Sequence, residues 1–229
     1  MAEQVKSKQR VADHGEVFTN EREVNAMLDM VKQETERIES RFLEPACGNG
    51  NFLAEVLRRK LDIVKTRYSK SLTEYEKYAF VAVGSIYGVE LLQDNAQECR
   101  DRLLGIVASE YLKVAKKSAN PRFLPVIEFV LNRNILCGDA LSLKAADDEP
   151  IIFSEWSIVT GNKAKRRDFR LDEMLEGNTN KGETMSLWGS SGTPTTEWKF
   201  DEETQSYIPM PVTLDRSFYG KYSCALSKL

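Results

Sequence analysis

The residues best suited to chemistry in this sequence of 229 residues form a glycine-rich segment, Leu43-Glu-Pro-Ala-Cys-Gly-Asn-Gly-Asn-Phe-Leu53. Gly48 and Gly50 permit a tight turn and close approach of a ligand to the backbone. If a helix follows, its first N–H groups suit an anionic ligand group. The spacing is not the dinucleotide fingerprint, because Leu53 stands where a third glycine or alanine is needed. The segment predicts a ligand-binding turn between a strand and a helix; the alternative is a turn that serves packing alone.

Two acidic residues follow at the ends of later apolar segments, in Tyr87-Gly-Val-Glu90 and Asn134-Ile-Leu-Cys-Gly-Asp-Ala140. An ionised carboxylate accepts hydrogen bonds from hydroxyl and amino groups. Taken singly, Glu90 and Asp139 are ordinary acids at strand ends.

These segments resemble, in order, those of DNA adenine-N6 methyltransferases of the restriction-modification type. The glycine-rich segment is similar to the family motif Asp/Glu-Pro-x-Cys-Gly-x-Gly-x-Phe-Leu. The resemblance implies S-adenosylmethionine as cofactor, with Glu90 holding both ribose hydroxyls, Leu91 against the adenine and Asp139 accepting from the adenine amino group. Gly15-Glu-Val-Phe-Thr19 resembles the segment that folds over the methionine end. The residues implied to bind the cofactor are Thr19, Glu44, Pro45, Ala46, Cys47, Gly48, Gly50, Asn51, Phe52, Glu90, Leu91, Asp139 and Ala140.

The catalytic motif departs from the family. After the fourth strand, members carry Asn-Pro-Pro followed by Tyr or Phe; the Asn and first Pro carbonyl hold the target amino group, and the ring stacks on the extruded base. This chain has Ile158-Val-Thr-Gly-Asn-Lys-Ala-Lys165. Asn162 aligns as the candidate catalytic residue, but neither proline nor the aromatic residue is present. We therefore expect an incomplete catalytic motif; an ordinary turn asparagine is the alternative.

Basic residues cluster directly after Asn162, where the resemblance predicts the rim of the cofactor site. The candidate DNA contacts are Lys163, Lys165, Arg166 and Arg167. Lysine and arginine at this density suit phosphates, whereas the alternative is a solvated loop. The net charge of −3 and the pI near 5.5 exclude a broadly basic DNA-binding protein. Contact with DNA must be local, or a protein partner must supply target recognition.

The elements that must position these residues alternate between strands and helices. Asn20 and Glu23 resemble a capping box, followed by Val24, Met27, Leu28 and Val31 at helical spacing. We expect strands at 41–46, 85–91, 134–137 and 151–159, with helices after Gly50 and from Asp94 onward. This alternation predicts an α/β fold, a Rossmann-like methyltransferase domain with a doubly wound parallel sheet.

The domain is expected to span residues 1–176, beginning with a polar lead-in over 1–13. Residues 177–229, rich in Gly, Ser and Thr at their start, are expected to form an irregular C-terminal extension. No further strand–helix units are evident after Asn162, so the chain looks shortened relative to the family.

The cysteine content, the N-terminus and the lengths of the apolar segments indicate the cellular compartment of the protein. Four scattered cysteines and a single histidine argue against zinc and disulfides, and the N-terminus has no apolar signal core. No apolar run is long enough for a membrane span. We expect a cytoplasmic protein without a metal. Two rivals remain: a non-catalytic cofactor-binding or regulatory subunit that acts through a partner, and a methyltransferase acting on protein or a small molecule.

Overall fold

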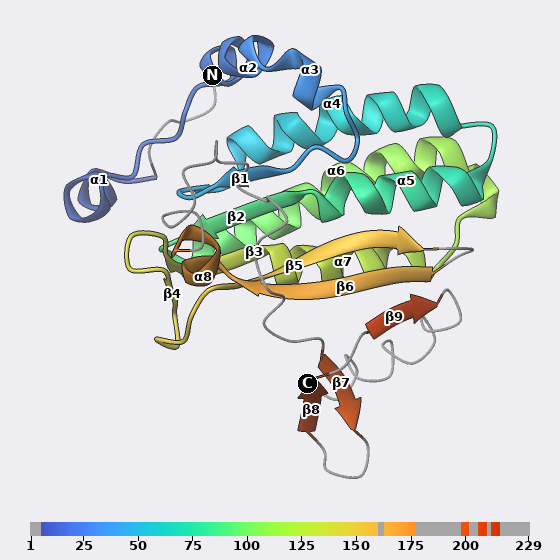
Figure 1. Cartoon of the computed structure of the whole chain (residues 1–229). Coiled ribbons are helices and arrows are strands. Elements are labelled where there is room, and N and C mark those ends of the chain that lie inside the picture. Colours follow the sequence, from blue (N-terminus) through green and yellow to red (C-terminus); the bar gives the residue numbers. More distant parts are fainter. Residues whose placement is uncertain (1–5, 160–162, 177–197, 202–205, 210–211, 216–229) are drawn as a thin grey trace. The chain divides into compact units, whose positions relative to one another are not determined.

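The computed structural model describes residues 6–159, 163–176, 198–201, 206–209 and 212–215 (Figure 1). The chain divides into two compact units, residues 1–140 and 141–229.

The first unit carries a parallel sheet connected by helices. Its elements are α1 (Lys8–His14), α2 (Glu21–Met30), α3 (Lys32–Thr35), β1 (Phe42–Glu44), α4 (Asn51–Tyr68), α5 (Leu72–Gly84), β2 (Ile86–Glu90), α6 (Gln93–Ala115), the 3-10 helix η1 (Lys116–Ser118), α7 (Phe123–Asn134) and β3 (Ile135–Asp139). The strands lie in the order β1-β2-β3, with Glu44 opposite Gly88 and Glu90 opposite Cys137. The expected strand–helix alternation with parallel strands is confirmed for these three strands.

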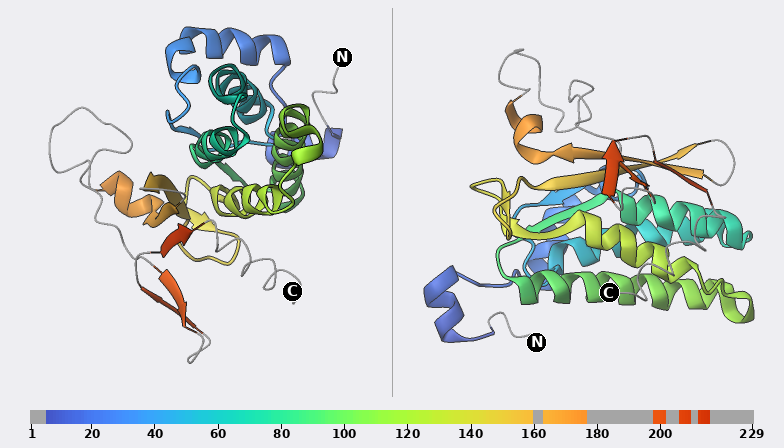
Figure 2. Two further views of the ribbon diagram at one scale, coloured as in Figure 1. Left: turned by 90° about the vertical axis from the view of Figure 1, so that its right-hand side faces the viewer. Right: turned by 90° about the horizontal axis from the view of Figure 1, so that it is seen from below.

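Each connection between neighbouring strands contains two α-helices instead of the single helix expected. α4 and α6 pack against each other and against the strands, and α5 and α7 pack against them in turn. A helix of 18 residues is about 27 Å long, whereas a strand of five residues is about 16 Å. The long helices therefore run past the ends of the strands, and α5 and α7 bring the chain back, as Figures 1 and 2 show.

Local sequence accounts for where α2 and α4 begin. The capping box at Asn20 and Glu23 is confirmed: the Asn20 side chain accepts from Arg22 N, and the Glu23 carboxylate accepts from Asn20 N. Val24 and Leu28 are buried as expected, but Met27 and Val31 are 48% and 44% exposed, which narrows the apolar face. α4 begins directly after Gly50.

The core of the first unit lies between the helices and the sheet. Leu53, Val56 and Leu57 of α4 have exposed fractions of 1% or less. One face of α6 carries four fully buried residues at helical spacing: Ala96, Cys99, Leu103 and Val107. This packing holds α4 and α6 firmly at the edge where the strands end.

The second unit is built on antiparallel pairing. Its elements are β4 (Lys144–Ala145), β5 (Ile152–Val159), β6 (Lys163–Arg170), α8 (Leu171–Glu176), β7 (Trp198–Asp201), β8 (Ser206–Pro209) and β9 (Val212–Asp215). β6 lies between β5 and β9 and is antiparallel to both, and β7 pairs with β8. Trp156 of β5 is 8% exposed.

Four expectations were wrong. The segment 151–159 contains a strand, but this strand pairs with β6 in an antiparallel ladder and not with the parallel strands β1, β2 and β3. The basic residues after Asn162, expected at a cofactor rim with a solvated loop as the alternative, belong to that partner strand, Lys163–Arg170. The polar lead-in contains α1, whose N-terminus is capped by Ser7. The extension after residue 176 contains β7, β8 and β9, so it is not irregular throughout.

The domain boundary is also placed differently. The compact units divide after Ala140 rather than after Glu176, because β5 and β6 make their pairing contacts with each other and with β9. A boundary at residue 176 would separate β6 from β9, two strands joined by backbone hydrogen bonds.

Candidate functional site

Three acidic residues stand at the same edge of the parallel sheet. Glu44, Glu90 and Asp139 are the last residues of β1, β2 and β3, respectively. Ligands of open α/β sheets bind at the carboxyl ends of the strands. Burial raises the pKa of the Glu44 carboxyl. The strand order thus gathers the predicted acids at one edge.

Glu90 is joined directly to the glycine-rich turn. Its Oε2 accepts a hydrogen bond from Gly48 N at 2.8 Å. Its Oε1 accepts from Leu92 N at 3.1 Å and from Asn95 Nδ2 at 3.2 Å. Glu90 is 8% exposed. These bonds fix the carboxylate between the turn after β1 and the start of α6.

The glycines of the turn are required by backbone conformation and by close neighbours. Gly48 and Gly50 have φ angles of 53° and 82°, in the left-handed region. A Cβ at Gly50 would lie 2.6 Å from Cys99 Sγ, and a Cβ at Gly48 would lie 3.2 Å from the Phe18 ring. The turn is therefore closed on one side by α6 and on the other by the segment before α2.

The start of α4 keeps its backbone donors available. Gly50 is its N-cap and offers no side-chain acceptor to the first turn. Arg102 of α6 donates to Asn49 O at 3.4 Å and also bonds Asn51 Oδ1. Burial, followed by the nearby Arg58 charge, lowers the pKa of Arg102. A guanidinium thus holds the turn from the α6 side and adds positive charge near it.

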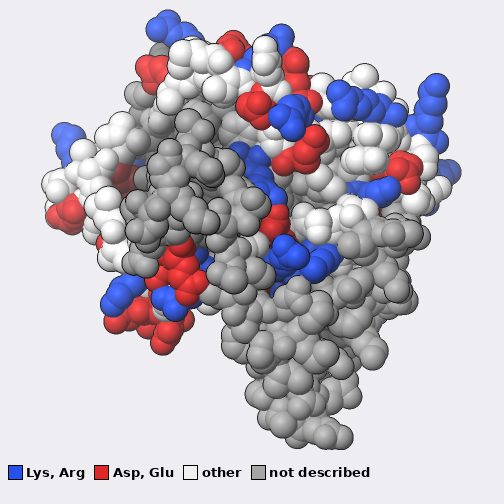
Figure 3. Space-filling view, viewed as in Figure 1, with Lys and Arg blue, Asp and Glu red and all other residues white. Residues whose placement is uncertain are grey.

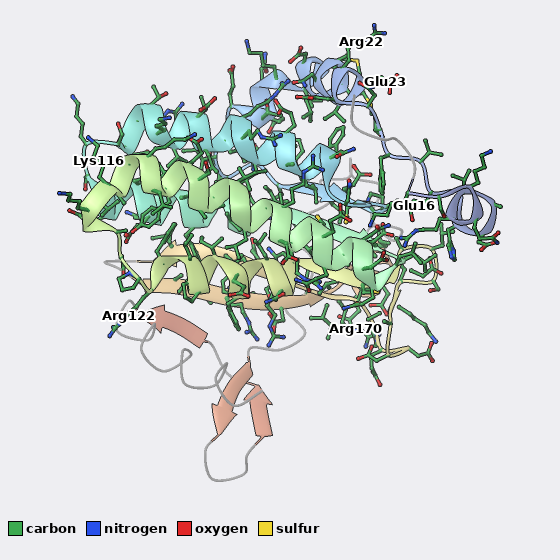
Figure 4. The ribbon with its side chains drawn as sticks, turned by 180° about the vertical axis from the view of Figure 1, so that it is seen from behind. Glu16, Arg22, Glu23, Lys116, Arg122 and Arg170 are labelled. Atoms are coloured by element: carbon green, nitrogen blue, oxygen red, sulfur yellow. The ribbon has the colours of Figure 1, made fainter. Side chains whose placement is uncertain are left out.

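A second hydrogen-bond network joins the N-terminal segment to Glu90. Asn95 Nδ2 donates both to Glu90 Oε1 and to Glu16 Oε2, the latter at 3.3 Å. Arg10 Nε donates to the same Glu16 oxygen at 2.6 Å. Figure 4 shows Glu16 on the segment after α1, beside the start of α6. The segment that contains Glu16 therefore lies against the end of β2.

The N-terminal segment is further held by ion pairs with the first turns of α6. Arg10 Nη1 lies 2.6 Å from Asp94 Oδ2, and Lys6 Nζ lies 2.5 Å from Glu98 Oε2. The Arg10 guanidinium lowers the pKa of Asp94 to about 2.

The structure brings together the cofactor residues expected from the sequence within the first unit. Thr19 O accepts from Asn51 Nδ2 at 3.0 Å, which ties the Gly15–Thr19 segment to the start of α4. Leu91 is 57% exposed and available to a ligand. Cys47 is buried, and its pKa is raised by a hydrogen bond with Cys99 and by burial. Pro45 and Ala46 lie on the turn after β1, Phe52 lies in the first turn of α4, and Ala140 directly follows β3.

The predicted catalytic and DNA-contacting residues belong to the second unit. Asn162 lies outside the described residues, and of Lys163 only the backbone is described. Lys165 is half-buried opposite Ser157 of β5, and Arg167 is exposed. Arg166 is buried and bonds Asp168 at 2.6 Å. Arg166 is therefore engaged within its own unit.

Sequence reasoning missed four contributors to this site: Arg10, Glu16, Asn95 and Arg102. Two of them carried a usable signal. Asn95 follows Glu90 by five residues, and Glu16 itself lies inside the segment already compared with the family. Arg10 and Arg102 act through contacts distant in sequence, which no local pattern reveals.

Other kinds of site find little support in the described part of the chain. No group of three or more His, Cys, Asp or Glu side chains is placed there to hold a metal ion. Cys47, Cys99 and Cys137 are free thiols. No described helix is both long and apolar enough to cross a membrane. On the face seen in Figure 3, basic and acidic side chains are interspersed.

Two known proteins that are named as methyltransferases are distantly similar to this chain. The chain is 26% identical over 153 residues to DNA methyltransferase A of Bacillus subtilis (strain 168), covering 65% of this chain and 17% of that protein. It is 29% identical over 132 residues to "Putative type II restriction enzyme and methyltransferase RM.MjaORFECS2P" of Methanocaldococcus jannaschii, covering 56% of this chain and 10% of that protein. No family model and no solved structure matches. These two distant similarities support a DNA methyltransferase family, and the chain spans a small part of each relative.

Proposed function

We propose that the first unit binds S-adenosylmethionine and that the chain serves the methylation of adenine in DNA. The observation that carries the proposal is the hydrogen bond between Gly48 N and Glu90 Oε2, at 2.8 Å. It joins the two sequence motifs that resemble the methyltransferase family, although they lie far apart in the chain. Both distant relatives are named as methyltransferases.

The residues present fit this cofactor. The left-handed glycines leave the turn without side chains that would block a ligand, and α4 begins there without a side-chain cap. Glu90 retains an acceptor site for a ribose hydroxyl, and Asp139 ends the neighbouring strand, where an adenine amino group needs an acceptor. When bound, the cofactor would supply an electrophilic methyl group. The chain's own residues would orient it and hold it at the edge of the sheet.

The segment aligned with the catalytic motif resembles the family less than the cofactor-binding segments do. Ala164 and Lys165 occupy the positions of the second proline and the aromatic ring, and both pair with β5 in a ladder. Lysine offers no flat face to an extruded base, a contact worth about 1–3 kcal/mol in comparable sites. Without proline at position 163, the backbone acceptor is less preorganised. We therefore predict that this chain alone transfers methyl groups to DNA poorly.

Two measurements test the proposal. Calorimetry should show binding of S-adenosylmethionine or S-adenosylhomocysteine in the micromolar range or tighter, and Asp139→Ala should weaken it by about 1–3 kcal/mol. Absence of any binding to the wild type would overturn the proposal.

The second measurement is transfer from labelled cofactor to unmethylated DNA, with protein and small-molecule fractions as parallel acceptors. Labelling of protein or a small molecule instead of DNA would assign another methyltransferase class. A third outcome is robust labelling of plain duplex DNA by the wild type and none by Asn162→Ala. This outcome would show that the chain is an active DNA methyltransferase with an unusual catalytic motif.

A further inference from the structure

Glu16 has one satisfied and one unsatisfied carboxylate oxygen. Oε2 accepts from Arg10 Nε at 2.6 Å and from Asn95 Nδ2 at 3.3 Å. Oε1 is buried and has no hydrogen-bond partner in the described part of the chain, and the side chain is only 7% exposed. Leaving a buried carboxylate oxygen without a donor is costly. A bound molecule, whether water or ligand, would satisfy this atom by donating a hydrogen bond to it.

Glu90 by itself cannot serve both hydroxyls of a ribose in this arrangement. A carboxylate has about four lone-pair sites. Three of those of Glu90 are used by Gly48 N, Leu92 N and the Asn95 amide. Only one site remains, on Oε2. A ligand with two neighbouring hydroxyls needs a second acceptor close by.

Glu16 lies where that second acceptor is needed. The single amide nitrogen of Asn95 donates to Glu16 and to Glu90, so the two carboxylates lie side by side. Arg10 holds Glu16 from the other side while it pairs with Asp94 at the start of α6. The position of Glu16 is therefore set by residues from both α1 and α6.

We propose that Glu16 Oε1 accepts one ribose hydroxyl of the cofactor and Glu90 Oε2 accepts the other, an inference that rests on the proposed function. In this arrangement Glu16 lies over the ribose, and the ion pairs of Lys6 and Arg10 with α6 hold it there. Glu16 is thereby a determinant of specificity for a ribose over a deoxyribose.

The competing assignment is that Glu16 receives the ammonium group of the methionine portion. 5′-Methylthioadenosine separates the two, because it keeps the ribose and lacks the ammonium group. Glu16→Gln is the informative variant, since its amide oxygen can still accept from Arg10 and Asn95 while the charge facing the ligand is lost. Asp13→Asn is the matched control, an exposed acid on α1 whose described bond is to Gln9.

Calorimetry on the full chain should show that Glu16→Gln weakens S-adenosylhomocysteine and 5′-methylthioadenosine by the same factor, about tenfold. The wild type should bind the ribose ligand more tightly than its 2′-deoxy and 3′-deoxy analogues. One of these analogues lacks the hydroxyl that Glu16 accepts, and for that analogue the affinities of Glu16→Gln and of the wild type should be equal. Asp13→Asn should change nothing, and thermal melting verifies that each variant is folded.

Loss of affinity for S-adenosylhomocysteine alone would assign Glu16 to the ammonium group and overturn the inference. Unchanged affinity for both ligands would overturn it while leaving the proposed function intact. Absence of binding by the wild type would overturn both.

Discussion

Gly48 N and Glu90 Oε2 lie 2.8 Å apart, so the turn after β1 and the end of β2 form one hydrogen-bonded unit. Glu90 also accepts from Leu92 N and from Asn95 Nδ2, and it is 8% exposed. Because the Glu90 carboxylate accepts three hydrogen bonds, it stabilises the fold, and its remaining acceptor site on Oε2 is available to a ligand.

Replacing Glu90 should therefore impair stability and binding together. Glu90→Ala leaves three donors without an acceptor, and we expect the free energy of unfolding to fall by about 2–4 kcal/mol. Urea denaturation measures this change. Glu39→Ala is the control, because the Glu39 side chain is 66% exposed and its contact with Arg37 is a surface ion pair, so a change within about 1 kcal/mol is expected. Equal effects of the two substitutions would contradict a buried network around Glu90.

Adding one methyl group to the glycine turn should be costly. Gly50→Ala places a Cβ 2.6 Å from Cys99 Sγ at a φ of 82°. Steric overlap and the left-handed backbone together should destabilise the protein by about 2–4 kcal/mol. Cys99→Ala in the same chain should recover only the steric part, which a double-mutant cycle measures.

Gly105 provides the control for that experiment. It lies inside α6, and a Cβ there would meet no atom within 4 Å. Gly105→Ala should therefore stabilise the protein by about 0.5–1 kcal/mol through helix propensity. If both alanine substitutions destabilise equally, the close contact at Gly50 is not the cause.

Lys60 should make stability depend on pH in the neutral to alkaline range. It is fully buried in α4 and donates to Ile38 O and Ser85 Oγ. Burial lowers its pKa from 10.5 to about 7. Between these two values the unfolded chain binds more protons at this site than the folded one, so stability should rise with pH, by up to about 1.4 kcal/mol per unit. Below about pH 7 the amine is charged in both states, and its contribution becomes constant.

Lys60→Met isolates this contribution, because the other titrating groups are shared with the wild type. The difference in unfolding free energy between the two proteins should change steadily from pH 7 to pH 10 and level off below. Urea titrations across this range measure it. Parallel stability curves would mean that Lys60 keeps an ordinary pKa in the folded state.

Exposed and buried arginines of β6 should differ in their effect on DNA binding. Arg167 is exposed, whereas Arg166 is buried against Asp168. If β6 contacts phosphates, Arg167→Ala should lower DNA affinity and reduce the slope of log affinity against log salt by about one. Fluorescence anisotropy at several salt concentrations provides both quantities.

Arg22→Ala removes the same charge from an exposed position on α2 and serves as the control. An equal loss of affinity in both variants would indicate that only net charge matters. Arg166→Ala is unsuitable as a test, because it removes the positive charge that pairs with the buried Asp168 carboxylate, a change that typically costs about 3–5 kcal/mol in stability.

The sequence alone determined the features that depend on neighbouring residues. Asn20 and Glu23 cap α2 through bonds between residues two and three positions apart. The turn at Gly48 and Gly50 needs left-handed backbone, which glycine adopts without steric cost. The buried face of α6 follows from helical spacing. The acids at the ends of β2 and β3 were found for the same reason, since each directly follows its own apolar strand.

Tertiary structure decided what depends on partners distant in the chain. The sequence of β5 is apolar enough for a parallel sheet, yet its hydrogen-bonding partner is β6, and strand composition does not encode the direction of the neighbour. The placement of Glu16 beside Glu90 requires Asn95 and Arg10, which come from two separate helices. An unsatisfied carboxylate oxygen is visible only after every donor around it has been placed, because hydrogen bonding inside a protein is a property of the packed neighbourhood rather than of the residue.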